Sequence, residues 1–295
     1  MGHEKDTYQP VRPSSWRDPR LYQIVSLSTL LLYGLVFLYF DVSIFQIIVT
    51  LSTAQLTQYA ATKYFDVPSF DPKSALISSL SLCLLLRTND LAVAAMAAFI
   101  AIASKFVIRW NNKHIFNPTN LGLVVVLTTG FGWMSPGQWG QVAWFGFLLA
   151  CLGSLVITRA ARADVTLAFL VFYIGLLVTR ALWLGDPLTI PLHQIESGAL
   201  LIFAFFMISD PKTTPDSRTG RILFALIVAL AALYVQFWLF TPNGPLWGLI
   251  ACSLCVPMLD RLFPGIRYNW ATPTIGRTTQ SIPISLSLHP QRRLS

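Results

Sequence analysis

The chain has 295 residues, of which 54% are hydrophobic and only 12% charged, and its mean hydropathy is +0.59. Soluble domains carry about 25% charged residues, so this composition excludes an ordinary soluble protein and predicts a polytopic membrane protein. The formal net charge of +8 would suggest nucleic-acid binding in a soluble protein. Here the basic residues lie in short segments between apolar runs, so we expect a lipid bilayer around the chain and no nucleic-acid partner.

Ten apolar segments, taken in chain order, predict an all-α fold of about ten transmembrane helices. Residues 1–20 precede them and lack the architecture of a secretory signal peptide, so we expect a cytoplasmic N-terminal tail. The transmembrane domain is predicted over residues 21–263, and residues 264–295, rich in Thr, Ser, Pro and Arg, are predicted to be a disordered tail. The predicted helices cover residues 21–40, 43–61, 74–86, 91–108, 117–133, 139–157, 165–183, 197–208, 222–240 and 245–259.

The positions of Lys and Arg predict the orientation of these helices, because short cytoplasmic loops collect basic residues and external loops do not. With the N-terminus inside, all but three of the 21 Lys and Arg residues fall on the cytoplasmic side. We interpret the exceptions, Arg87, Lys105 and Arg180, as anchors whose charged ends reach towards the membrane surface, with a functional charge as the alternative. The sequence therefore predicts a multi-pass protein of the plasma (inner) membrane with both termini in the cytoplasm.

Two predicted helices, 74–86 and 197–208, are too short to cross a hydrocarbon core, which needs about 20 residues. Each begins at a Ser and ends at a polar stop that contains an Asp, namely Asp90 or Asp210. Five helices per half would give the halves opposite orientations, which predicts two inverted five-helix repeats with short helices 3 and 8. Interrupted helices in such folds point to a site between the repeats. The alternative is that both short segments have only a packing role.

Three polar motifs interrupt the apolar region in order: HIFNPTNLG at residues 114–122, AFFMISDPKTTP at residues 204–215, and VPMLD at residues 256–260. They resemble the F-N-P-(A/S)-x-x-G, A-F-F-(I/M)-A-T-D-P-V-T and (V/M)-P-L-I-D segments of the RnfD/NqrB membrane-subunit family. Thr119, Asn120 and residues 212–215 are closer to a short subgroup typified by UnbU. The resemblance implies a membrane subunit of an electron-transport or ion-translocating system that works with other membrane electron-transfer subunits.

The first two motifs also have a local physical interpretation. Asn117 is a good N-cap, and Pro118 suits the first turn of a helix, where its missing N–H costs nothing. Pro211 stops a helix at the preceding residue, which leaves Asp210 near the negative end of the helix dipole. We therefore expect Asp210 to have a partner, with Lys212, Arg218 and Arg221 as the candidates.

The sequence departs from the resemblance where that family attaches a covalent flavin phosphate to a Thr in an external S-(G/T)-A-T loop. The corresponding connection is about Ser135-Pro136-Gly137-Gln138, without a Thr, and the S-G-A at residues 197–199 is followed by Leu200. We therefore expect no covalent FMN. A non-covalently bound flavin or quinone stays open, and the cofactor is unknown.

Two classes of function follow. The first, implied by the resemblance, is a membrane component of such an electron-transport or ion-translocating system, and the second is a stand-alone channel or carrier for a small solute, by analogy with urea-type channels. No catalytic residue set and no metal-ligand cluster is visible, and residues 185–196 are predicted to form a hydrated external loop. The candidate residues of a cofactor-binding or transport site are Ser74, Asp90, Asn117, Pro118, Asn120, Ser197, Asp210, Thr213 and Thr214.

Overall fold

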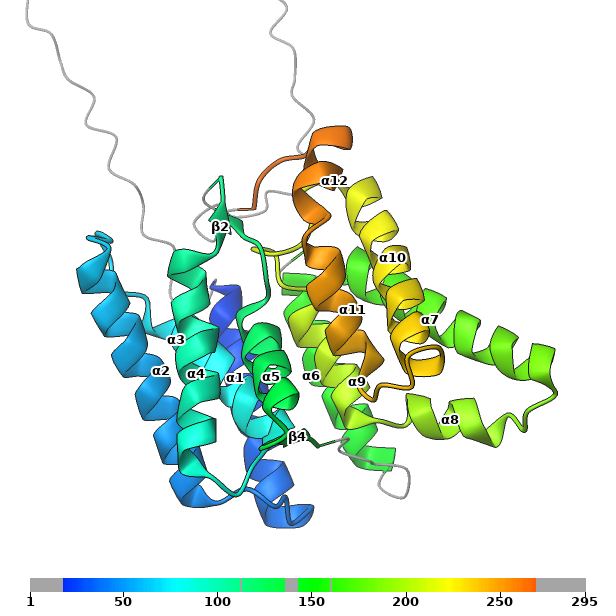
Figure 1. Ribbon diagram of the computed structural model, residues 1–295, viewed down its shortest axis with the longest axis horizontal. Coiled ribbons are helices and arrows are strands. Elements are labelled where there is room, and N and C mark those ends of the chain that lie inside the picture. Colours follow the sequence, from blue (N-terminus) through cyan, green and yellow to red (C-terminus); the bar gives the residue numbers. More distant parts are fainter. Residues whose placement is uncertain (1–17, 112, 136–142, 160, 269–295) are drawn as a thin grey trace, which may run out of the picture.

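The computed structural model describes residues 18–111, 113–135, 143–159 and 161–268, which form a helical bundle (Figure 1). Nearly all of both predicted tails lies outside these ranges. The all-α prediction is confirmed in that the described chain is mostly helical, with four strands of two residues each. Its elements are α1 Pro19–Phe37, α2 Ile44–Tyr64, α3 Pro72–Leu85, β1 Leu86–Arg87, α4 Leu91–Val107, β2 Arg109–Trp110, β3 Lys113–His114, α5 Pro118–Thr129, β4 Trp133–Met134, α6 Ala143–Arg159, α7 Ala163–Leu184, α8 Thr189–Ile195, α9 Gly198–Ile202, η2 Phe203–Met207, α10 Arg218–Phe237, α11 Gly244–Ser253 and α12 Val256–Leu262.

The helices lie where the apolar segments predicted them, with two differences. The predicted external loop at residues 185–196 contains α8, a helix of seven residues that is too short to show a periodic pattern in the sequence. The last predicted helix is broken into α11 and α12, which are bent by 56° relative to each other. The small strands join neighbouring connections, since β1 pairs with β4 and β2 pairs with β3, both antiparallel.

Helix length alone does not give ten membrane crossings. Among the described residues, three helices are long and apolar enough to cross, namely α1, α7 and α10, and the bent pair of α11 and α12 would make a fourth. Shorter apolar helices, including α3, α5 and the α9–η2 segment, lie between them. The number of crossings and the inverted repeat therefore stay predictions.

Helix packing follows the same pattern in the two halves of the chain. In the first half α2 packs against α4, α4 against α5, and α1 against α3. In the second half α7 packs against α10, α10 against α11, and α6 against α9 and η2. Contacts between α1 and α6 and between α5 and α11 join the halves (Figure 1).

The continuous segment formed by α9 and η2 ends in five residues of π-helix. Its last turn is closed by a bond from the Ile208 N–H to the Phe203 carbonyl at 3.0 Å, so the Ala204 carbonyl loses its usual α-helical donor. The Thr166 hydroxyl of α7 donates to that carbonyl at 2.9 Å. All five π-helix residues are buried, and such a carbonyl must find a partner in protein because lipid has no hydrogen-bond donors.

An ionic network ties β3, α7, α10 and α12 together at one end of the bundle. The Arg221 guanidinium pairs with the Asp164 carboxylate at 2.5 Å and donates to the Asp216 carbonyl at 2.7 Å. The Lys113 ammonium bridges the carboxylates of Asp216 and Asp260 at 3.0 and 2.7 Å. Arg221 is only 9% exposed, so the loss of its partner would leave a nearly buried charge.

Asp164→Asn should therefore destabilise the protein by about 3–5 kcal/mol, the usual cost of removing one partner of a buried ion pair. The measurement is thermal unfolding of the purified protein in detergent. Asp186→Asn is the matched control because its ion pair with Arg180, at 3.4 Å, has both side chains 36% exposed and should contribute little. Equal melting temperatures for the two variants would contradict this account.

Candidate functional site

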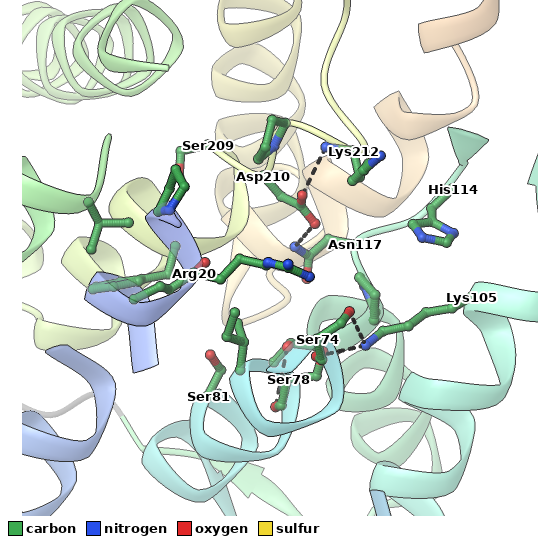
Figure 2. A pocket seen from close by; sticks show the side chains of 18 of the residues that line it. Arg20, Ser74, Ser78, Ser81, Lys105, His114, Asn117, Ser209, Asp210 and Lys212 are labelled. Carbon is green, nitrogen blue, oxygen red and sulfur yellow. Dashed lines mark hydrogen bonds between the residues drawn. The ribbon is translucent and has the colours of Figure 1, made fainter. Parts of the chain in front are cut away.

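The first and second motifs meet at a cavity of about 220 Å³, which we call the Asp210 cavity (Figure 2). It lies where α3 and α5 begin and where the chain leaves η2. Polar and charged side chains line much of it, and Figure 2 shows those of Asn117 and Asp210 in contact and that of Lys105 reaching Ser74. The polar and charged lining residues are Arg20, Gln23, Asp71, Ser74, Ser78, Ser81, Lys105, His114, Asn117, Thr119, Ser209, Asp210 and Lys212.

Asn117 joins the start of α5 to the end of η2. As predicted, it is the N-cap of α5, where its side-chain oxygen accepts from the Asn120 N–H at 3.1 Å, and Pro118 occupies the first turn. Its amide nitrogen donates to the Met207 carbonyl and to the Asp210 carboxylate, each at 3.3 Å. One side chain thus caps one helix and satisfies the last turn of another.

The next two polar residues of the motif connect α5 to other helices. The Thr119 hydroxyl donates to the Ser78 carbonyl of α3 at 3.4 Å, and the Asn120 amide donates to the Leu246 carbonyl of α11 at 3.0 Å. The Asn120 side-chain oxygen is buried without a partner among the described residues. Asn117, Thr119 and Asn120 therefore fix α5 against three different elements, which explains the density of polar residues in this motif.

Asp210 forms a turn that receives hydrogen bonds from its own segment. Its carboxylate accepts from the Lys212 N–H at 2.9 Å, and its carbonyl accepts from the Thr214 N–H and hydroxyl at 3.1 and 3.0 Å. The expected partner Lys212 is thus present through its backbone, and Asn117 is a partner that the sequence did not predict. Arg221 is not a partner, because it pairs with Asp164.

The candidates do not all gather at one site. Ser74, Asn117, Pro118 and Asp210 line the Asp210 cavity, while Thr213 and Thr214 are buried in the adjoining turn. Asn120 lies one turn into α5 and faces α11. Asp90 is an exposed N-cap of α4, bonded to the Ala92 N–H at 2.8 Å, and Ser197 lies at the start of α9.

Lys105 was not among the predicted site residues, since we interpreted it as a surface anchor with a functional charge as the alternative. Lys105 is only 5% exposed, and its ammonium donates to the Ser74 carbonyl and hydroxyl at 2.9 and 3.1 Å. The signal in the sequence was a lone Lys close to the end of an Ala-rich helix, which also fits an anchor. Its burial depends on α3 lying alongside, which no local pattern encodes.

A second cavity, of about 250 Å³, lies at the start of α9 and of α11, and we call it the Ser197 cavity. Ser197 caps α9 by accepting from the Leu200 N–H at 3.4 Å, and Tyr173 donates to Gln236 at 3.0 Å within the lining. His193 and Gln194 of α8 complete its polar side. Because Phe203 lines this cavity and Phe206 lines the Asp210 cavity, the α9–η2 segment runs from one cavity to the other.

Both cavities are smaller than the roughly 300–1,000 Å³ that is typical of sites for drug-sized ligands. Within the described residues there is also no group of three or more His, Cys, Asp or Glu that could hold a metal ion. We expected no flavin-bearing Thr in the connection at residues 135–138. Apart from Ser135, this connection lies outside the described residues. The arrangement can hold ions and water-sized groups next to Asp210.

The comparisons with known proteins concern mainly the second half of the chain. The sequence model of the NQR2, RnfD, RnfE family matches residues 127–268. The RnfD subunit of the ion-translocating oxidoreductase complex of Erwinia tasmaniensis is 30% identical over 145 residues, 48% of this chain and 37% of that protein. The proteins of the same name from Escherichia coli strain SMS-3-5 and Aliivibrio salmonicida are 31% and 28% identical, over 45% and 44% of this chain and 36% and 35% of theirs.

These matches confirm the resemblance to RnfD proteins that the motifs predicted. The second and third motifs lie within residues 127–268, and the motif at residues 114–122 lies before them. The aligned part spans little more than a third of each relative. The closer likeness to the UnbU-like subgroup stays a prediction.

The stability of this region should depend on pH through His114. Burial, with Lys105, Arg109 and Lys212 nearby, lowers the pKa of His114 to about 3 from 6.5, although a hydrogen bond with the Lys105 backbone opposes the shift. As pH falls below about 6.5 the unfolded chain takes up a proton that the native protein does not, so stability is lost. The melting temperature should fall less between about pH 7.5 and pH 5 in His114→Gln than in the wild type.

His193→Gln is the matched control, since His193 is exposed on α8. Its melting temperature should follow the pH dependence of the wild type. A His114→Gln profile that also coincides with the wild type would show that His114 is not held neutral by its surroundings.

Proposed function

We propose that this chain is the RnfD-like membrane component of a bacterial inner-membrane system that couples electron transfer to ion translocation, and that it works with other membrane subunits. The observation that carries the proposal is the match of residues 127–268 to this family. That match includes Asp210, the residue that the structure places beside Asn117 at the cavity. A stand-alone solute channel is not favoured by any relative found.

The two cavities suggest how an ion would pass. The Ser197 cavity lies at the start of the α9–η2 segment and the Asp210 cavity at its end, so only the middle of this short segment separates them. Phe203 and Phe206 are buried in that middle part. We infer that Asp210 supplies the fixed charge at one end of the path, and that the aromatic residues keep the two cavities apart.

An inverted repeat is supported by a correspondence between α5 and α11. Asn117 and Asn243 occupy the N-cap positions of these helices, and a Gly follows five residues later in each case. A Cβ on Gly122 would lie 2.6 Å from the Ala97 carbonyl of α4, and one on Gly248 would lie 3.0 Å from the Val228 carbonyl of α10. Each half thus uses a glycine for a close approach between two helices, α5 to α4 in the first half and α11 to α10 in the second.

The first test is the pair Asp210→Asn and Asn117→Ser in the purified or membrane-embedded protein. The amide in the first variant would keep an oxygen for the Lys212 N–H, and the hydroxyl in the second would keep an N-cap for α5, so both variants should insert normally. Because they remove the charge or the bridge between α5 and η2, ion-coupled electron transfer should fall by more than about tenfold. Asp90→Asn is the matched control, an N-cap exchange far from the cavity that should retain full activity.

Wild-type activity in both Asp210→Asn and Asn117→Ser would overturn the site. Conduction of a neutral solute by liposomes that contain only this chain, without any redox partner, would favour the solute-channel alternative. Co-purification of a tagged chain with flavin- or iron–sulfur-containing membrane subunits would support the proposed assembly.

The second test concerns orientation. The basic residues predict that both termini are cytoplasmic, so a phosphatase reporter fused after Ser295 should be inactive and a fluorescent reporter that matures only in the cytoplasm should be bright. A reporter after Asp186 should show the opposite behaviour because the segment around α8 is predicted to be external. An active phosphatase at Ser295 would contradict the N-in, C-in topology.

A further inference from the structure

The ammonium of Lys105 lacks a countercharge in direct contact. Its two hydrogen-bond partners are both atoms of Ser74, and no carboxylate of the described residues lies within 4.0 Å of it. Because Lys105 is only 5% exposed, water can do little to stabilise the charge. A buried charge is costly unless it is paired, so this ammonium is the group of the Asp210 cavity that most needs a ligand.

Asp210 and Asp71 attract the Lys105 ammonium electrostatically, but neither forms an ion pair with it within 4.0 Å. Asp71 is paired with Arg20 at 2.7 Å, and Asp210 accepts from the Lys212 backbone and from Asn117. The Lys212 side chain also lines the cavity and makes no ion pair with a described residue. The lining therefore carries three cations, Arg20, Lys105 and Lys212, against two carboxylates.

Two helices add positive potential at the same place. α3, with 14 residues, and α5, with 12, both begin at the cavity, so their partially positive ends face it. Ser74, Ser78 and Thr119 also line the cavity, but the Ser78 and Thr119 hydroxyls already donate to the Ser74 and Ser78 carbonyls. Positive helix ends together with an ammonium form the usual environment for a bound oxyanion.

We propose that the Asp210 cavity binds a small phosphate-type oxyanion, with Lys105 as the principal ligand. The cavity of about 220 Å³ has room for such a group but not for a whole nucleotide. His114 gives a reason to expect phosphate rather than an anion without a hydroxyl group, because its Nδ1 atom needs a hydrogen-bond donor. The ring interacts with the Lys105 backbone, and Nδ1 is buried without a partner among the described residues, so in the neutral ring it is the acceptor that a P–OH group can satisfy.

The test is equilibrium binding of inorganic phosphate to the purified, delipidated full-length protein in a neutral detergent, followed by ³¹P NMR and by melting temperature. We expect saturable binding that chloride at equal ionic strength does not reproduce and that sulfate, without a hydroxyl, reproduces only weakly. Lys105→Met should weaken binding by about 10- to 100-fold, the loss expected for one charge-assisted hydrogen bond. Lys73→Met is the matched control, because Lys73 pairs with Asp18 at 2.8 Å and does not line the cavity.

Two further arms identify the source of the phosphate group. Displacement of phosphate by a short-chain phosphatidic acid but not by phosphatidylcholine would assign the site to a lipid headgroup, and displacement by FMN but not by riboflavin would assign it to the end of a flavin nucleotide. Absence of saturable binding, or equal affinity in Lys105→Met and Lys73→Met, would overturn the inference. Binding does not require electron transfer, so loss of phosphate binding and loss of the Asp210-dependent activity are measured separately.

Discussion

The structure depends on the α9–η2 segment, a helix too short to cross a bilayer whose ends must still be satisfied inside the protein. Its start is capped by Ser197, and its end receives the Asn117 amide at the Met207 carbonyl. Within the segment, the Ala204 carbonyl lacks its usual α-helical N–H donor, and the Thr166 hydroxyl donates to it instead. Since lipid offers no hydrogen bonds, the α9–η2 segment depends on α5 and α7 for these partners. The polar cavities at both ends follow from this arrangement, because backbone ends and their partners gather there.

Much of this architecture could be predicted from the sequence. The apolar runs indicated the helix positions, and the local chemistry of Asn117 and Pro118 indicated the start of α5, because an N-cap acts within one turn. The motifs around Asn117 and Asp210 were predicted to be important, and they lie in contact although 93 residues separate them. What linked them in advance was the resemblance to a family, since residue periodicity carries no information about which helix ends meet.

The errors have a common physical cause. Lys105 and Arg221 were assigned from their places along the chain, as a membrane anchor and as a partner of Asp210, whereas their real partners, Ser74 and Asp164, come from other helices. The same holds for α8, where seven residues are stabilised by their packing against α7 rather than by a periodic pattern. Long-range charge pairing is set by the order in which helices pack. A single sequence shows which groups need a partner but not which partner each one finds.

The π-helix places one surplus residue in the α9–η2 segment. Residues Phe203–Met207 hold one residue more than the same stretch of α-helix would need, and each residue of an α-helix turns the chain by about 100°. Migration of this extra residue along the helix would rotate the side chains that it passes without changing the ends of the segment. Asp210 lies three residues beyond it and is held to α5 by a single side-chain contact from Asn117. Such migration would therefore turn side chains inside the segment, such as those of Phe203 and Phe206 that line the two cavities, while the Asp210 carboxylate would keep its contact with Asn117.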